Sequence, residues 1–394
     1  NKLKKAYEMY KDVLHLNSGH SDALFGIGVI LEKQRKFDLA IQFLSRAIES
    51  NPDKFQALLT RGRILRMQGK TKNAILDFTE VIAKHPDNFE ALIARGIAFG
   101  HTSQFSAAIE DFSLAIKINA HCSKAFYNRG VVYEKLRRFD SAIKDYSIAI
   151  KLDPHDYQSY NNRGVAQREK KCLSAALKDF EKAIEIKSDF AEGYYNKSLN
   201  LLSTGKIEEG FKLYEYRWNT AHFQSQIRNF PQPKWLGDED LTDKTILLHS
   251  EQGLGDSIQF CRYIKLFENL NCEVLLEIER PLMTLMQSLL PEDKIFEKGG
   301  HLPSFDFHCP IMSLPHAFLT NENTIPISWP YLFARKSAIN YWKRLLGPKK
   351  KIRVGISWKG NKSHTGDHKR SIPLTDIINE LDDEFEWVSL QYAI

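Results

Sequence analysis

The stretch HSEQGLGDSIQF, residues 249–260, follows an apolar run, TILLHS, and places two glycines beside acidic side chains. Gly253 and Gly255 permit a tight turn and let a ligand approach the backbone closely. If a helix starts here, its first N–H groups can bind an anion, or Asp256 can cap them. The motif lacks the third glycine of a dinucleotide-binding turn and the lysine of a P-loop. The turn is therefore a candidate ligand site, with helix capping as the structural alternative for Asp256.

The elements that position this turn follow from the hydrophobic pattern after residue 240. Three short apolar runs, TILLHS, CEVLLEI and IRVGISW, alternate with stretches of helical periodicity around 256–268, 281–290 and 337–346. This alternation predicts an α/β domain with a mainly parallel sheet. Ligands of such sheets bind at the carboxyl ends of the strands, so the glycine turn lies at the edge where a site is expected.

The first half of the chain repeats itself every 34 residues. The recurring glycines are Gly28, Gly62, Gly96, Gly130 and Gly164. Alanines follow in the same phase at Ala40, Ala74, Ala108, Ala142 and Ala176, with aromatic residues four positions later at Phe78, Phe112, Tyr146 and Phe180. This pattern resembles the tetratricopeptide repeat, whose paired helices need a small residue where they meet and a larger one beside it. The resemblance implies an α-solenoid of about six repeats, the first of them partial.

Polar residues recur in the same phase and are candidates for binding a partner. Asn128, Asn162 and Asn196 are one period apart and would form a ladder of amides facing an extended peptide in the groove. An arginine series precedes the glycines at Arg61, Arg95, Arg129 and Arg163. The alternative is that YNRG simply builds the helix, with each arginine paired to an acidic residue of the adjacent helix. The last unit ends in aromatics, which we expect to pack against the following domain: Tyr214, Tyr216 and Trp218.

Three ordered motifs, LLHSEQGLGDSIQFCRYI, FDFHCPIMSLP and RVGISWKGN with KRSIPL, resemble bacterial tetratricopeptide proteins that carry a family 9, ADP-heptose transferase-like glycosyltransferase domain. Protein O-GlcNAc transferases share the order of domains, but these motifs are closer to the heptose transferases. The resemblance covers essentially the whole chain. It implies the GT-B architecture, with the acceptor bound mostly by a first Rossmann-like domain and a nucleotide-sugar donor mostly by a second.

The resemblance also implies roles for the glycine turn. Asp256 would be the general base, although it follows a longer run here than in the family's Gly-Asp motif, and Glu251 is the alternative base. We expect Gln252, Gly253 and Gly255 to contact substrate. Inverting sugar transfer needs a base for the acceptor hydroxyl and positive charge or N–H dipoles for the departing diphosphate.

The loop after IRVGISW offers the positive charge. The resemblance places a basic residue of this loop on the donor diphosphate, and the candidates are Lys359, Lys369 and Arg370. Ser357 and Asn361 can add hydrogen bonds. A solvated polar loop is the structural alternative.

Other constellations have plainer explanations. The D-x-D spelling at 238–240 precedes the first strand, so we interpret it as a turn. His308 and Cys309 are adjacent on a predicted strand and therefore point to opposite faces, although Asp306 or His308 is a candidate for the cleft. His364 and His368 flank a glycine that disfavours a helix, so we expect neither a metal nor another cofactor.

Composition limits the class of protein. The net charge of +6 is spread along the chain, so no nucleic-acid partner is expected. No run approaches the roughly 18 apolar residues of a membrane span. Five cysteines without C-x-x-C spacing argue against a disulfide framework and a zinc site, which favours a cytoplasmic location.

Together these patterns predict a repeat array over 1–220, a linker over 221–241, a first Rossmann-like domain over 242–347 and the start of a second over 348–394. We expect a fragment cut at both ends and inactive by itself. The predicted function is inverting sugar transfer from a nucleotide-sugar to an acceptor recruited by the repeats. The alternative is a non-catalytic protein–protein interaction scaffold with a degenerate glycosyltransferase domain.

Overall fold

The structure is a computed structural model, and it describes residues 2–327, 330–360, 367, 371–378 and 380–390. The chain divides into two compact units, which are described separately. The first unit contains Asn1–Pro231, Trp235–Glu239 and Ser313–Ile325. The second contains Gln232–Lys234, Asp240–Met312 and Pro326–Ile394.

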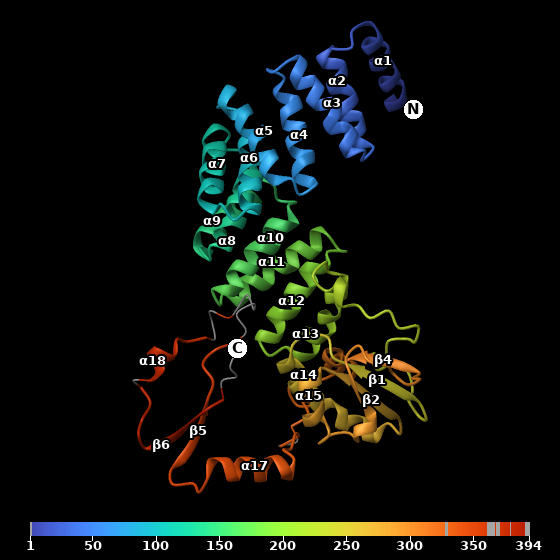
Figure 1. The fold of residues 1–394 in the computed structure, drawn as a ribbon, viewed down its shortest axis with the longest axis vertical. Coiled ribbons are helices and arrows are strands. Elements are labelled where there is room, and N and C mark those ends of the chain that lie inside the picture. Colours follow the sequence, from blue (N-terminus) through green and yellow to red (C-terminus); the bar gives the residue numbers. More distant parts are fainter. Residues whose placement is uncertain (1, 328–329, 361–366, 368–370, 379, 391–394) are drawn as a thin grey trace. The chain divides into compact units, whose positions relative to one another are not determined.

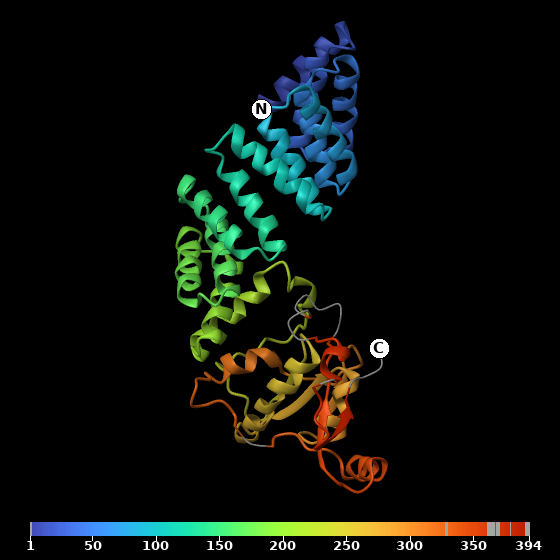
Figure 2. The ribbon, with the colours of Figure 1, turned by 90° about the vertical axis from the view of Figure 1, so that its left-hand side faces the viewer.

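The first unit is built from antiparallel helix pairs, which succeed one another from blue to yellow-green in Figures 1 and 2. The first helices of the pairs, called A helices, are α2 (Ser21–Lys33), α4 (Phe55–Met67), α6 (Phe89–His101), α8 (Ser123–Lys135), α10 (Tyr157–Glu169) and α12 (Ala191–Ser203). The B helices are α3 (Phe37–Ser50), α5 (Thr71–Lys84), α7 (Phe105–Ile118), α9 (Phe139–Leu152), α11 (Leu173–Ile186) and α13 (Ile207–Tyr214). Helix α1 (Lys2–Leu16) precedes them. The predicted α-solenoid is confirmed for this part of the chain.

The helices of a pair approach each other where the recurring glycine lacks a side chain. A Cβ atom on Gly96 would lie 2.7 Å from Cε1 of Phe112, and one on Gly62 would lie 2.5 Å from Cε1 of Phe78. Both rings are buried. Since protein interiors are close-packed, the glycine and the ring together fix how the A helix seats on its B helix.

The turn between the helices of each pair contains a residue in the left-handed region. These residues are Arg35, Gly69, Ser103, Arg137, Lys171 and Gly205, with φ between 59° and 81°. The series also has a period of 34 residues, but only two of its members are glycines. The turn therefore leaves little signal in the sequence, although its backbone is the same in every pair.

Arg217 closes the last helix pair. It lies in a short 3-10 helix (Glu215–Asn219), is fully buried, and stacks between the rings of Tyr214 and Trp218 at 4.5 and 4.4 Å. Its Nη2 donates to Ser313 Oγ at 2.8 Å, and its Nη1 donates to Glu215 Oε1 at 2.6 Å. The aromatic end of the repeats thus binds a segment almost a hundred residues further along the chain.

That segment continues into α16 (Leu314–Ala317), which packs on α13. Trp235 lies against Phe318 with ring centroids 5.5 Å apart, and its Nε1 donates to Glu239 O at 3.0 Å. The first unit therefore extends beyond the predicted boundary at residue 220. It includes residues that the sequence assigned to the linker and to the first Rossmann-like domain.

The second unit contains a parallel four-stranded sheet in the order β3-β2-β1-β4. Its strands are β1 (Thr245–His249), β2 (Glu273–Ile278), β3 (Ile295–Glu297) and β4 (Phe307–Pro310). Its helices are α14 (Leu254–Phe260) and α15 (Arg280–Met286), with 3-10 segments at Cys261–Asn269, Glu292–Lys294 and Ile311–Ser313. The predicted parallel sheet is confirmed, and the helices are shorter than the sequence pattern suggests.

A separate pair of parallel strands, β5 (Ile352–Ile356) and β6 (Phe385–Ser389), is accompanied by α17 (Lys336–Leu346) and α18 (Leu374–Ile378). Among the described residues, the four-stranded and the two-stranded sheet do not make up two complete Rossmann-like domains, so the GT-B architecture stays a prediction. In the part of the chain that the structure describes, no helix has the length and apolar character needed to cross a membrane.

Candidate functional site

The turn after β1 carries the predicted catalytic residues. The chain leaves the sheet at Ser250, whose N–H donates to Glu277 O at 3.0 Å, and α14 begins directly after Gly253. The N–H of Gly253 donates to Oδ2 of Asp256 at 3.0 Å, so this carboxylate caps the helix. Glu251, the alternative base, is buried. The capping role is thus present in the structure, and the role of either carboxylate as a base stays a prediction.

The strand order shows why this turn is well placed for a ligand. Strand β1 pairs with β2 on one side and with β4 on the other, so the order reverses between β1 and β4. In parallel sheets, ligands bind beyond the carboxyl ends of the strands at such a switch point. Of the residues expected to contact substrate, Gln252 and Gly253 lie in the turn at this edge, and Gly255 lies in the first turn of α14.

A polar network at the same edge escaped the sequence analysis. Glu279, directly after β2, accepts hydrogen bonds from Ser250 Oγ at 2.9 Å and Ser257 Oγ at 3.5 Å, and pairs with Lys298 at 3.1 Å. It ties the turn after β1 to the ends of β2 and β3. The signal was available, since Glu279 follows the run CEVLLEI and must therefore lie at the carboxyl edge.

His308 pairs with a second histidine of the sheet. Nε2 of His249 and Nδ1 of His308 are 3.1 Å apart, and both side chains are buried, at 2% and 8% exposure. Cys309 is fully buried and its thiol lies 3.4 Å from Pro310 O. The two neighbours thus have different surroundings, as the alternation along a strand requires.

Asp306 is not at the cleft, and that expectation was wrong. Its Oδ2 accepts a hydrogen bond from the N–H of Thr245 at 2.8 Å, which places it at the amino edge of the parallel sheet. The D-x-D motif lies in a turn, as expected, because Asp240 Oδ1 accepts a hydrogen bond from the Thr242 N–H at 3.0 Å.

Burial raises the pKa of the Cys261 thiol to about 12, so this cysteine is not a reactive nucleophile.

The predicted diphosphate-binding residues are only partly described. Ser357 and Lys359 follow β5, while Asn361, Lys369 and Arg370 lie outside the described residues, as do the two histidines of that loop. Among the residues that are described, no three His, Cys, Asp or Glu side chains come together as a metal site. The roles of this loop stay predictions.

The arginine series of the repeats forms a ladder of ion pairs. Arg129 binds Asp145 through Nε and Nη2, at 2.7 and 2.9 Å, and its Nη1 donates to Ser113 Oγ at 2.9 Å. The same contacts recur for the other three arginines, to Asp77, Asp111 and Asp179 and to Ser45, Thr79 and Ser147. Each arginine therefore joins an A helix to its own B helix and to the previous one, which is the structural alternative offered above.

The asparagine series also bonds within the array. Asn128 Nδ2 donates to Lys124 O at 2.7 Å, and Asn162 Nδ2 donates to the Tyr127 hydroxyl at 3.3 Å. Asn196 Nδ2 donates to Asn161 Oδ1 at 3.0 Å. Two of the three amides therefore link neighbouring A helices. Contact with a peptide stays a prediction for all three.

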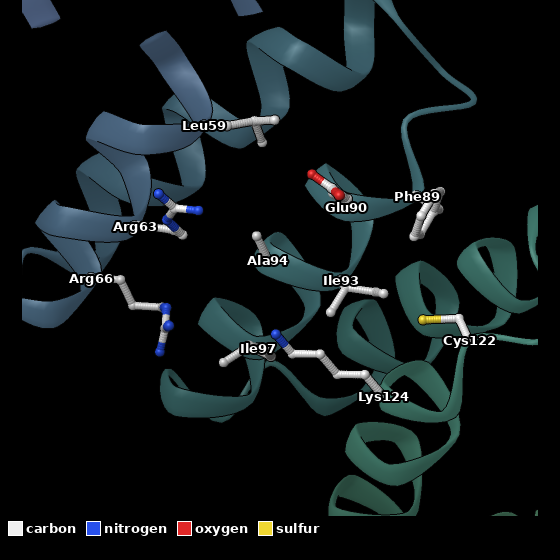
Figure 3. Close-up of a pocket in the computed structure, with 10 residues that line it drawn as sticks. All are labelled: Leu59, Arg63, Arg66, Phe89, Glu90, Ile93, Ala94, Ile97, Cys122 and Lys124. Carbon is white, nitrogen blue, oxygen red and sulfur yellow. The ribbon is translucent and has the colours of Figure 1, made fainter. Parts of the chain in front are cut away.

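A hollow of about 300 Å³ opens on the A helices α4, α6 and α8 and is drawn in Figure 3. Its apolar lining comes mainly from α6, which contributes Phe89, Ile93, Ala94 and Ile97, while α4 contributes Leu59. Three successive repeats thus build one concave site, for which no single repeat supplies enough surface.

The rim of this hollow is charged. Arg63 and Arg66 come from α4, Lys124 comes from α8, and Glu90 is the one carboxylate (Figure 3). Arg63 pairs with Glu32 at 3.1 Å. Within the described part of the chain, Arg66 and Lys124 have no ion-pair partner, and Nε of Arg66 is buried without a hydrogen bond. Burial, with the nearby Arg63, lowers the pKa of Arg66.

Comparison with known proteins follows the same division of the chain. Tetratricopeptide repeat models match residues 1–62, 59–121, 123–156 and 157–190. Protein FlbA of Caulobacter vibrioides is 26% identical over 183 residues, which cover 41% of this chain and 30% of FlbA. The match therefore spans less than a third of the length of that relative.

Two solved structures are similar to the helical part. The crystal structure of MamA protein is 26% identical, covers 44% of this chain and 94% of its own, and has a TM-score of 0.40. YrrB, described as a TPR protein with an unusual peptide-binding site, is 19% identical, with coverages of 48% and 98% and a TM-score of 0.42. The family models, the 34-residue period and the helix pairs agree, so residues 1–190 of this chain are an array of tetratricopeptide repeats.

Proposed function

We propose that this chain is a protein-interaction scaffold and that its repeat array binds a segment of a partner protein in the hollow on α4, α6 and α8. The observation that carries the proposal is the hollow itself, with its apolar lining and a rim where Arg66 and Lys124 lack an ionic partner in the described chain. Concave, mostly apolar sites with a few polar groups are where proteins take up ligands.

Site-specific photo-crosslinking tests this proposal. A photoreactive residue replaces Ile97, inside the hollow, in the full-length protein produced in its own host. The control variant carries the same residue in place of Leu114, which is exposed on the B helix α7. A partner crosslinked from position 97 and absent from position 114 supports the proposal. Equal recovery from both positions, or none from position 97, refutes it.

Sugar transfer is the second candidate function, and the strand order favours it. The glycine turn lies at the switch point between β1 and β4, where a parallel sheet binds its ligand. In this proposal, Asp256 or Glu251 removes the proton of the acceptor hydroxyl. A cation of the loop after β5, Lys359, Lys369 or Arg370, neutralises the diphosphate of the nucleotide-sugar donor, and no metal takes part.

A screen of nucleotide-sugars against the full-length protein, scored by release of nucleoside diphosphate, tests the second function. Asp256→Asn keeps an acceptor for the Gly253 N–H but removes the base, so turnover is expected to fall ~10² to 10⁴ times. Asp306→Asn is the matched control, because Asp306 bonds the Thr245 N–H at the opposite edge. Equal turnover of the two variants would remove Asp256 from the chemistry.

A further inference from the structure

The hollow has a charge asymmetry along α6. Glu90 lies in the first turn of this helix, where the helix dipole favours a carboxylate. The Lys124 side chain reaches towards Ile97 near the other end, and Glu90 and Lys124 lie on different sides of Ala94 in Figure 3. Arg66 adds a second cation from the last turn of α4. The end with Glu90 also has Arg63, but Glu32 pairs with that cation, so among the described residues the unpaired charges are negative at one end and positive at the other.

We infer that the hollow takes a peptide in which one large apolar side chain sits on the floor and an adjacent Asp or Glu lies against Arg66 and Lys124. This inference rests on the function proposed above and specifies the partner's chemistry. The volume of about 300 Å³ is at the lower end for ligand sites, so it suits one anchoring side chain with its backbone.

A carboxylate of the peptide would supply the counter-charge that Arg66 and Lys124 lack among the described residues. Nε of Arg66 is itself buried, so a ligand carboxylate would reach this cation through the Nη nitrogens. An arginine binds a carboxylate through parallel hydrogen bonds, and the Lys124 ammonium adds a second contact to the same charge. Burial, and secondarily the Arg63 charge, lowers the pKa of Arg66, and a bound carboxylate would oppose both effects.

The acidic end of the hollow sets the direction of the peptide. A carboxylate on the Glu90 side of the apolar anchor would meet a like charge, while a lysine or arginine there would meet an opposite one. Because discrimination improves when the wrong arrangement is repelled, the order of charges around the anchor matters as well as their presence. The site thus distinguishes an acidic residue on one side of the anchor from the same residue on the other.

The test measures the binding of short fluorescent peptides to the full chain by fluorescence anisotropy. One peptide has a central Leu flanked on one side by two Glu, and in the second both Glu are replaced by Gln. In the third, the Leu is replaced by Ser. We expect the first to bind and the other two to bind roughly tenfold more weakly. Only the first should weaken steeply as salt is added. Equal affinity of the Glu and Gln peptides would overturn the inference.

Variants locate the contact. Arg66→Gln and Lys124→Gln are each expected to weaken the acidic peptide roughly tenfold and leave the Gln peptide unchanged. Lys117→Gln, which removes an exposed cation from the B helix α7, is the control and should have no effect. If Lys117→Gln also weakens binding of the acidic peptide, the effect comes from the net charge of the protein, and the inference is wrong.

The crosslinking result separates this inference from the function on which it rests. If a partner crosslinks at position 97 while the acidic peptide does not bind, the hollow is a binding site and the inferred chemistry is wrong. If neither is observed, both proposals are wrong.

Discussion

At the scale of residues, the arginine ladder shows how one side chain is used in every repeat. Each carboxylate of the ladder is buried and accepts two hydrogen bonds from one guanidinium, while the remaining guanidinium nitrogen holds the preceding repeat. Removing one partner of such a pair leaves a charge without compensation inside the protein. The ladder therefore contributes to the registration of neighbouring repeats as well as to each repeat.

Arg129→Met is expected to lower the free energy of unfolding by about 3 kcal/mol, because Asp145 stays buried at 2% exposure without its partner. The double variant with Asp145→Leu should regain part of the lost free energy of unfolding, because it no longer has a buried carboxylate without a partner. Urea unfolding of the full chain measures both. The control is Lys182→Met, which breaks an exposed pair with Glu185 and should cost less than about 1 kcal/mol. An equal cost for the two single variants would contradict the assignment.

Glu134 gives the array a pH dependence of known sign. Burial raises the pKa of this carboxyl, although Tyr146 donates a hydrogen bond to it at 2.9 Å. The folded chain therefore binds this proton more tightly than the unfolded chain. Protonation of Glu134 on acidification through its folded pKa stabilises the folded state, and its ionisation at neutral pH destabilises that state. Glu134→Gln should raise Tm at neutral pH, with a gain that vanishes below the ordinary glutamate pKa. A gain that does not change with pH would exclude this origin.

At the scale of elements, a glycine in the A helix packs against a ring in the B helix in four of the six helix pairs, and Gly28 packs against Leu44 in the first. The sequence predicts this pairing because both partners recur with the same period. The left-handed turn between the helices was not predicted, since Arg35, Ser103, Arg137 and Lys171 occupy it in four of the six pairs. The backbone there is set by the packing of the two helices, which leaves the residue type largely free.

Gly96→Ala tests the close approach of the helices. Helix propensity favours alanine by about 1 kcal/mol, but overpacking costs about 1–3 kcal/mol, and the new Cβ would lie 2.7 Å from Phe112. We expect a net loss of stability, partly recovered by Phe112→Leu. Gly100→Ala in the same helix is the control, because its Cβ would meet only Val132 at 3.8 Å. It should be neutral or stabilising, and the same sign for both variants would contradict this account.

The candidate sites differ in how well the sequence could reveal them. The turn at Gly253–Asp256 was placed at the correct edge because parallel strands share one carboxyl edge. The hollow was not predicted, since positions of the same phase in the three repeats that build it carry different residue types: Glu90 and Lys124, for example, are 34 residues apart. Periodicity identifies what the repeats share, and the site consists of what they do not share.

At the scale of the whole molecule, the last repeat is completed by a distant segment. Arg217 joins Tyr214 and Trp218 to Ser313 without exposure to solvent, so residues 313–325 belong to the same unit as the repeats. No local sequence pattern predicts a contact between residues that are 96 positions apart. The last repeat and this segment therefore belong to one compact unit, although the strands β1 to β4 lie between them in the sequence.

Arg217→Met is expected to cost about 3–5 kcal/mol and to expose the segment 313–325 to protease, because Ser313 and Glu215 lose the cation between them. Limited proteolysis followed by mass spectrometry locates the new cleavage. Lys212→Met, on the exposed side of α13, is the control and should leave the cleavage pattern unchanged. A variant that melts earlier without new cleavage in 313–325 would show that Arg217 stabilises only its own helix turn.

We propose that the repeat array binds its partner on α4, α6 and α8. Hydrogen exchange of the full chain, with and without the partner recovered by crosslinking from position 97, tests it most directly. We predict slower exchange in these three A helices, greatest in α6, and no change in the B helices α5 and α7. Protection confined to the B helices or to the second unit would contradict the claim.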